Sequence, residues 1–496
     1  MIGALLLLAL SQKIPGTSTP FDLSDPAALL SELEAVELSR LEVGGGPSLT
    51  FEEVVRSVDR HHPELLGARQ RQSGAAGQLL AAEGGFDLRL DAALEHRPLG
   101  YYDTTHLIAK LEQATPLWGA KLYAGYELGL GKIPLYDGDY QTLDAGELKA
   151  GLRVPIWRDG PIDKRRAAIG KAAFVLDAEA AATRVALLEL SLDAGEAYWK
   201  WVAAGQSYLV AVALYDLARD RDAQLATKVK NGAVPAIDRA ENLRAVLTRR
   251  EGVVAARRSL EQAALKLSLY ARDEAGRPRV PDAKRLPLEW EPSPPLPLSE
   301  LDQGLVRAAE RPELARYRAL EEAASVELDF AENRVAPQID LDVSAAKDLG
   351  TSDDPSKITT LGPAELKAGV TFSLPLQLRS ERGEREAASA KLEETRQKAQ
   401  YAREKVENQI RDLWSALSAQ RELVDVATRT VRVAKAVAEG ERTRFELGST
   451  TLFIVNLREQ SAADAETKAL KALADYRTAL LAWQLATAQQ PPPGGQ

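Results

Sequence analysis

Two pairs of closely spaced aspartates are the residues of this chain that come nearest to catalytic chemistry. Asp340 and Asp342 stand two residues apart, and Asp87 and Asp91 stand four apart, each pair within or beside a segment of alternating polarity. Two carboxylates held together can divide the roles of general acid and general base. However, no nucleophile–base motif or phosphate-binding loop accompanies them, and the charged face of a strand explains both pairs. The sequence therefore predicts no catalytic residue and no enzyme.

The adjacent histidines His61 and His62 are the nearest approach to a metal site. Neighbouring side chains project in different directions, the chain has only four histidines, and it has no cysteine to complete a ligand set. We interpret the pair as a solvated junction between helices and expect no metal and no cofactor. The charge run "RDAQLATK", Arg221–Lys228, is likewise interpreted as a solvated helix face.

The composition favours long helices over a mixed globular enzyme. Of 496 residues, 45% are hydrophobic but only 6% are aromatic, while alanine, leucine, glutamate and arginine dominate the middle of the chain. The 63 basic and 72 acidic residues give no basic footprint, so nucleic acid is not an expected partner.

The first residues, "MIGALLLLALSQ", predict a signal peptide and leader over residues 1–20. An apolar run from Ile2 to Leu10 precedes a small-x-small site at Ala9 and Ser11. No later segment approaches the ~20 consecutive apolar residues of a membrane helix. If the chain crosses a membrane, we expect it to do so with strands.

Several segments of the first half of the sequence recur in the second half. "ELKAG" occurs at Glu147 and again at Glu365, and "RHHPELLGARQ" corresponds to "AERPELARYRA". We predict two tandem repeats over 49–272 and 298–488, joined by a proline-rich connector over 273–297 and followed by a disordered tail over 489–496.

Each repeat is expected to contain one very long helix and a returning helix. The long helices are predicted near Ile162–Lys230 and Ser380–Leu447, and each carries a seven-residue apolar period typical of a coiled coil. Gly232 and Gly448 suit C-terminal caps at the turns, after which helices return over about 236–270 and 451–487.

Four segments alternate with the period of a strand, at residues 86–94, 148–156, 339–345 and 366–374. Two further candidates, 107–112 and 121–130, lie in an insertion over residues 96–146. The insertion is rich in aromatic residues, namely Tyr101, Tyr102, Trp118, Tyr123, Tyr126, Tyr136 and Tyr140. It is interpreted either as surface loops, with an aromatic interface belt as one role, or as extra strands.

The strands are either a half-buried sheet of a soluble domain or the wall of a membrane barrel. Coiled-coil helices flank them and no globular core is apparent, so a lipid-facing apolar side and a charged lumen side account for them better. A spanning sheet must close, and closed bacterial barrels have at least about eight strands. Four strands per chain therefore predict an oligomer that shares one barrel.

From about Leu49 to Gln489 the chain resembles the TolC-like outer-membrane efflux and secretion proteins. The matching segments are "HPEL" and "RPEL", "APQIDLDV", "LRVPIWRDGPIDKRRA", "TFSLPLQLRSERGERE", "NGAVPAIDRAENLRA" and "GSTTLFIVNLRE". The resemblance implies a mostly α fold with β: a homotrimer with four strands per chain in a twelve-stranded transmembrane β-barrel, and a coiled-coil barrel through the periplasm. The connector would form part of an equatorial belt.

The resemblance also implies a periplasmic tip at the turns of Gly232 and Gly448. Family members constrict this tip with acidic residues six and nine positions after the second turn glycine, where this chain has Ile454 and Leu457. The same offsets in the first repeat give Asp238 and Glu241. We expect these two acids to supply the charge at the entrance, paired with Arg239, Arg244 or Arg458, while Ile454 and Leu457 narrow it. Helix capping by Asp238 is the competing interpretation.

The function expected from the resemblance is a passive exit duct in the outer membrane of a Gram-negative bacterium, extending into the periplasm. It would pass small molecules or polypeptides from an inner-membrane pump, through a periplasmic adaptor (membrane fusion) protein, across the outer-membrane lipid. A periplasmic coiled-coil scaffold without channel activity is the alternative, and a hydrolase using the paired aspartates is a remote third.

Overall fold

The computed structural model describes residues 40–99, 103–131, 141–289, 300–351 and 364–487, and the chain divides into two units. The first unit contains the segment that ends at His62, Leu190–Leu301, and the segment from Arg411 onward; the second contains Pro63–Glu189 and Asp302–Ile410. Each predicted repeat therefore contributes to both units. The expected signal peptide, the tail and the end of the connector lie outside the described residues.

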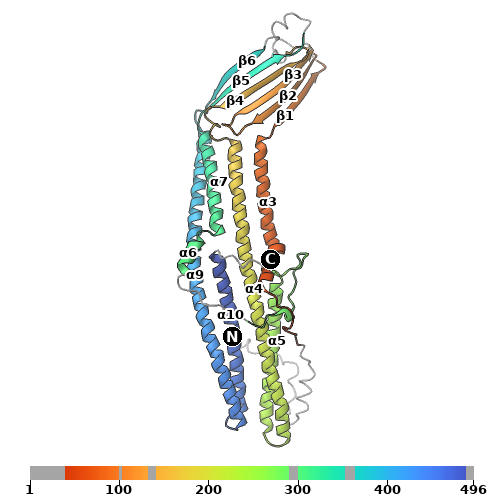
Figure 1. The fold of residues 1–496 in the computed structure, drawn as a ribbon, viewed down its shortest axis with the longest axis vertical. Helices are drawn as coiled ribbons and strands as arrows, with labels where there is room; N and C mark the ends of the chain where they lie inside the picture. Colours follow the sequence, from red (N-terminus) through yellow and green to blue (C-terminus); the bar gives the residue numbers. More distant parts are fainter. Residues whose placement is uncertain (1–39, 100–102, 132–140, 290–299, 352–363, 488–496) are drawn as a thin grey trace, which may run out of the picture. The chain divides into compact units, whose positions relative to one another are not determined.

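The second unit holds one sheet of six antiparallel strands, whose order in space is their order in the sequence (Figure 1). The strands are β1 (Arg89–Arg97), β2 (Thr104–Ala114), β3 (Lys121–Gly131), β4 (Glu147–Pro155), β5 (Gln338–Asp348) and β6 (Glu365–Ser373). The four predicted strands are confirmed as β1, β4, β5 and β6. β1 begins later than predicted, because Phe86 belongs to a 3-10 turn, η1 (Gly84–Phe86).

The prediction of four strands per chain is wrong, because the described residues form six. The insertion contains a hairpin, β2–β3, which pairs with β1 on one side and with β4 on the other. The alternation over 107–112 and 121–130 was the local signal for these strands. Of the two interpretations of the insertion, extra strands is confirmed.

Four helices meet the sheet at one edge (Figure 1). Helix α3 (Pro63–Glu83) leads through η1 into β1, and α7 (Pro312–Arg334), preceded by α6 (Glu300–Ala308), leads into β5. The long helices α4 (Lys164–Lys230) and α9 (Arg379–Glu446) leave the same edge after β4 and β6. A proline begins both α3 and α7, where its missing N–H is tolerated, so the repeated "PEL" marks the same structural position.

The first unit consists mainly of two helical hairpins. α4 turns back into α5 (Ala236–Leu267), and α9 turns back into α10 (Leu452–Ala486), while α2 (Phe51–His61) packs nearby. No member of the predicted apolar series, from Ile162 to Leu225 and from Ile410 to Phe445, is exposed, and Leu190, Ala218 and Leu417 are buried. The predicted helices and their coiled-coil seams are confirmed.

The core of the first unit is aromatic around the middle of α4. Trp201 and Tyr208 are fully buried, and Tyr198 donates a hydrogen bond to the carbonyl of Leu49 at 2.8 Å. The described part of the connector contains a single 3-10 turn, η3 (Ala283–Arg285), and Leu286 after it is buried against α4. As predicted, residues 273–289 form neither a long helix nor a strand.

The interpretation of the histidine pair as solvated is wrong for His62. His62 is buried and stacks on Tyr270, with ring centroids 5.8 Å apart. No cluster of potential metal ligands occurs within the described segments. Among those same segments, no helix is sufficiently long and apolar to cross a membrane.

Candidate functional site: a two-faced sheet and a buried charge cluster

The sheet has one apolar face that continues across all six strands. Residues paired directly across neighbouring strands point to the same side, so the register assigns each residue to a face. This face carries Leu90, Ala92, Leu94, Leu107, Ala109, Leu111, Leu122, Ala124, Tyr126, Leu128, Leu130, Leu148, Ala150, Leu152, Val154, Ile339, Leu341, Val343, Ala345, Leu366, Ala368, Val370 and Phe372. The remaining members, His96, Thr105, Gln113 and Lys347, each lie next to a terminal residue of a strand.

The opposite face is charged. It carries Arg89, Asp91, Glu95, Arg97, Lys110, Glu112, Lys121, Glu127, Glu147, Lys149, Arg153, Asp340, Asp342, Asp348, Glu365 and Lys367. Residues of both signs occur on it, and ion pairs link Lys110 to Glu112 at 3.0 Å and Arg153 to Asp342 at 3.1 Å. The aspartates Asp340 and Asp342 thus belong to a charged surface, as the strand interpretation expected.

One tyrosine joins three strands on this charged face. The hydroxyl of Tyr123 on β3 donates a hydrogen bond to Asp342 on β5 at 3.0 Å, reaching across β4 at Gly151. Lys110 on β2 lies over the same ring, with its Nζ 5.3 Å from the ring centroid. The inserted hairpin and the strands of both repeats therefore share one polar network.

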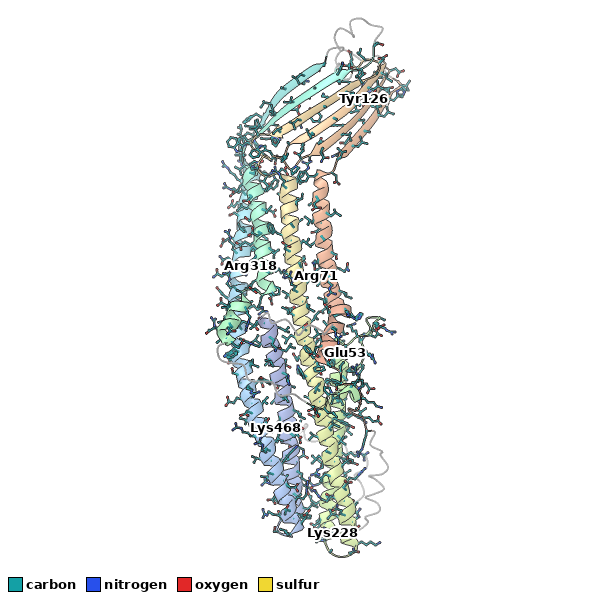
Figure 2. The ribbon with its side chains drawn as sticks, viewed as in Figure 1. Glu53, Arg71, Tyr126, Lys228, Arg318 and Lys468 are labelled. Carbon is teal, nitrogen blue, oxygen red and sulfur yellow. The ribbon has the colours of Figure 1, made fainter. Side chains whose placement is uncertain are left out.

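In each hairpin of the first unit, the first helix ends in a glycine cap, as predicted. Gly232 and Gly448 have φ of +66° and +72°, values that favour glycine. After α4, the amide of Gly232 donates to Val229 and that of Ala233 to Lys228; the turn after α9 repeats both bonds. This is the Schellman pattern, which satisfies the last carbonyls of each helix. Lys228, labelled in Figure 2, lies beside the first of these turns.

The predicted constriction residues lie in the first two turns of the returning helices. Asp238 and Glu241 are half-buried on α5, and Glu241 accepts hydrogen bonds from Arg244 at 2.7 and 3.1 Å. On α10, Ile454 is half-buried and Leu457 is 47% exposed. Their role at an entrance stays a prediction.

The competing interpretation, a capping bond from Asp238, is not what the structure shows. The residue that caps α5 is Pro235, and no side chain makes a capping hydrogen bond there. Asp238 stands in the first turn, where a negative charge still interacts favourably with the helix dipole. Of the three proposed arginine partners, Arg244 pairs with Glu241, whereas Arg239 pairs with Asp222 at 3.2 Å.

A buried charge cluster joins the two helical hairpins just beyond these turns. Glu459 of α10 accepts hydrogen bonds from three arginines: Arg249 of α5 at 2.9 Å, Arg442 of α9 at 3.1 Å, and Arg221 of α4. The side chains of Glu459 and Arg249 are only 3% and 2% exposed. Asn456, one turn earlier on α10, accepts from Arg221 at 2.8 Å.

Burial alone raises the pKa of Glu459, but the hydrogen bonds and charges of Arg221 and Arg249 outweigh it and hold that pKa below its ordinary value. The carboxylate is therefore ionised at neutral pH. Because all four helices of the two hairpins contribute to one site, the cluster fixes the hairpins against each other.

This cluster was not predicted from the sequence, and the prediction for part of it was wrong. Arg221 and Asp222 belong to the run interpreted as a solvated helix face, yet Arg221 is largely buried and Asp222 is fully so. The available signal was spacing: Asn456 and Glu459 fall between the buried Leu452, Val455 and Ala462 on one helical stripe. Charged residues on such a stripe indicate buried partners rather than solvent.

Comparison with known proteins agrees with this architecture. Residues 307–489 match the family described as outer membrane efflux protein. No curated protein sequence matches the chain. The family match thus covers only the second part of the chain.

Three solved structures illustrate the similarity. The Campylobacter jejuni CmeC outer membrane channel is 14% identical with a TM-score of 0.62, covering 92% of each chain. The Vibrio cholerae outer membrane protein VceC is 17% identical with a TM-score of 0.60, covering 88% of this chain and 95% of its own. The open Neisseria gonorrhoeae MtrE outer membrane channel is 15% identical with a TM-score of 0.60, covering 93% and 95%.

The resemblance to TolC-like proteins predicted from the sequence is confirmed. Residues 307–489 match the outer membrane efflux protein family, and the chain as a whole has the fold of these outer-membrane channels.

Proposed function

We propose that this protein is the subunit of an outer-membrane exit channel, which passes small molecules or polypeptides outward without bond chemistry. The observation that carries the proposal is the two-faced sheet. Its strands are 9 or 11 residues long, and a membrane-spanning strand needs about 9–11 residues. An apolar outer face and a charged inner face are what a channel wall between lipid and water requires.

The sheet of one chain cannot form such a wall alone. Its outermost strands, β1 and β6, have no partner on their outer edges among the residues that the structure describes, and every residue of both is exposed. Unpaired strand edges are not tolerated in lipid. We infer that β1 of one copy pairs with β6 of the next, and that three copies close one barrel.

The helices support the same assembly. On α9 the side chains of Val426, Val433 and Val437 are 55%, 63% and 42% exposed, along a stripe that one chain leaves uncovered. Neighbouring copies would cover it and enclose a helical tunnel through the periplasm. An adaptor and an inner-membrane pump would deliver the cargo, and the turns at Gly232 and Gly448 would form the end that receives it.

The entrance residues complete the proposal. Asp238 and Glu241 would provide negative charge at the receiving end, and Ile454 and Leu457 would narrow it. The partial exposure of all four side chains leaves them accessible to a passing solute.

The test is the native mass of the protein extracted by detergent from the outer-membrane fraction, followed by conductance in planar bilayers. A trimer of the 53.8 kDa chain that conducts ions supports the channel. A monomer, or recovery in the soluble fraction, contradicts it and favours a periplasmic coiled-coil scaffold. A trimer that is anchored but does not conduct contradicts the channel as well.

A further inference from the structure

The hairpin β2–β3 is built into the middle of the sheet. Strand β2 pairs with β1, with Glu112 opposite Arg89 at one end and Thr104 opposite Arg97 at the other. Strand β3 pairs with β4, with Lys121 opposite Arg153 and Glu127 opposite Glu147. β1 therefore does not touch β4. The hairpin separates two strands that would otherwise be neighbours.

Insertion of a hairpin leaves the direction of the flanking strands and the two faces of the sheet unchanged. Two added strands are an even number, so β1 and β4 keep opposite directions and the helix junctions stay at one edge of the sheet. The two faces also continue through the hairpin: Leu107, Ala109 and Leu111 extend the apolar face. On the charged face the hairpin adds two basic and two acidic residues, Lys110, Lys121, Glu112 and Glu127, hence no net charge.

Specific contacts hold the hairpin to the rest of the sheet. Tyr123 bonds to Asp342 across Gly151, as described above. Near the helix junctions, Gln113 donates a hydrogen bond to the carbonyl of Phe86 at 2.6 Å. In the turn between β2 and β3, the indole of Trp118 packs on Gly160, where a Cβ would lie 2.7 Å from Nε1.

We infer that the β2–β3 hairpin is a wall element that widens the outer bore of the channel. This rests on the proposed channel function with three copies, for which six strands per chain give 3 × 6 = 18 strands instead of the twelve that the family resemblance implied. Barrel diameter grows roughly linearly with strand number, so the bore is about 1.5 times as wide and about twice as large in cross-section. The wider bore therefore admits, from the outer side, larger hydrated solutes than a twelve-stranded bore does.

The placement can be tested by disulfide trapping, because the chain has no native cysteine. The variant Ala92→Cys/Ala109→Cys joins β1 to β2, and Ala124→Cys/Ala150→Cys joins β3 to β4; both pairs are directly opposed in register. The control Ala150→Cys/Ala345→Cys joins β4 to β5. A fourth variant, Ala92→Cys/Ala150→Cys, spans three strand spacings, ~14 Å, beyond the reach of a disulfide.

Oxidation of the first three pairs but not the fourth, in protein from the outer-membrane fraction, supports the inference. If the β4–β5 control oxidises while the hairpin pairs do not, the hairpin lies outside the wall and the inference fails, although the channel stands. If the protein is absent from the outer membrane, both the inference and the channel fail.

The width is tested by replacing residues 98–146 with a two-residue turn that joins β1 directly to β4. Neutral polymers of graded size are added on the outer side, where they meet the barrel before the helices. The largest polymer that lowers the conductance is expected to be smaller in the shortened variant, because its bore is formed by fewer strands. An unchanged exclusion size in a conducting, correctly assembled variant would overturn the inference.

Discussion

The ring of Tyr123 occupies the space above Gly151, the residue directly opposite it on the next strand. A Cβ at residue 151 would lie 2.4 Å from both Cζ and Oη of the tyrosine. The glycine belongs to the repeated "ELKAG", whose second copy supplies Gly369, and there nothing lies within 4 Å of the same position. One repeat thus uses its glycine to admit the inserted hairpin, and the other does not.

Gly151→Ala is therefore expected to destabilise the protein, whereas Gly369→Ala is not. The added methyl displaces the ring of Tyr123 and breaks its hydrogen bond to Asp342, at a cost of about 1–3 kcal/mol. Thermal unfolding of the extracted oligomer, followed by circular dichroism, measures the difference between these matched variants. Equal stability of the two would show that Tyr123 does not pack over Gly151.

Local periodicity predicted most of the secondary structure. The seven-residue series located α4 and α9 within a few residues, and the two-residue alternation located all six strands. What alternation does not encode is pairing partners, because register between distant strands depends on the whole sheet. The strands at 107–112 and 121–130 were visible, yet their pairing with β1 and β4 was not, and the count of four came from the segments that alternate in both repeats.

The charge cluster was missed for a related reason. A sequence window shows that Glu459 is charged but not that Arg221, Arg249 and Arg442 come from three other helices. Charged residues are usually exposed, so a charge run reads as a solvated face. These side chains become buried, and form ion pairs with one another, only when the two hairpins pack together.

Glu459→Gln is expected to weaken the contact between the two hairpins strongly. Removing one partner of a buried ion pair leaves an uncompensated charge and costs about 3–5 kcal/mol. The control is Glu466→Gln, one heptad later on α10, whose partner Lys435 is 54% exposed, so that the expected cost is about 0–1 kcal/mol. Amide hydrogen exchange in residues 446–465 is the measurement, and equally small effects of both substitutions would contradict the role of the cluster.

The same carboxylate predicts an acid-sensitive contribution to stability. The folded-state pKa of Glu459 lies below its ordinary value of 4.5, so its contribution is fully present above pH 4.5 and is lost as the pH falls through the folded-state pKa. Arginine side chains in general stay protonated over this acidic range. The exchange rates of the native protein and of Glu459→Gln should differ at neutral pH and converge in acid. A difference that does not shrink as the pH is lowered would contradict the assignment.

Replacing two glycines at or near the end of α9 by alanine is expected to change the free energy of unfolding in opposite directions. At Gly448, with φ of +72°, alanine is strained by about 1–2 kcal/mol. At Gly440, inside α9 with nothing within 4 Å, alanine favours the helix by about 0.5–1 kcal/mol. Gly448→Ala should lower, and Gly440→Ala should raise, the free energy of unfolding measured in denaturant. A stabilising Gly448→Ala would rule out the cap.

The entrance hypothesis predicts an electrical effect of the paired acids on α5. If Asp238 and Glu241 face the permeating solute, replacing both by alanine removes two negative charges per chain, or six per trimer, and lowers the preference for cations. The control is Glu251→Ala, an exposed acid further along the same helix. Reversal potentials in a salt gradient give the selectivity, and the effect should weaken at high salt because the charges are screened. An unaltered reversal potential in the double variant, with trimer and conductance intact, would remove the two acids from the pathway.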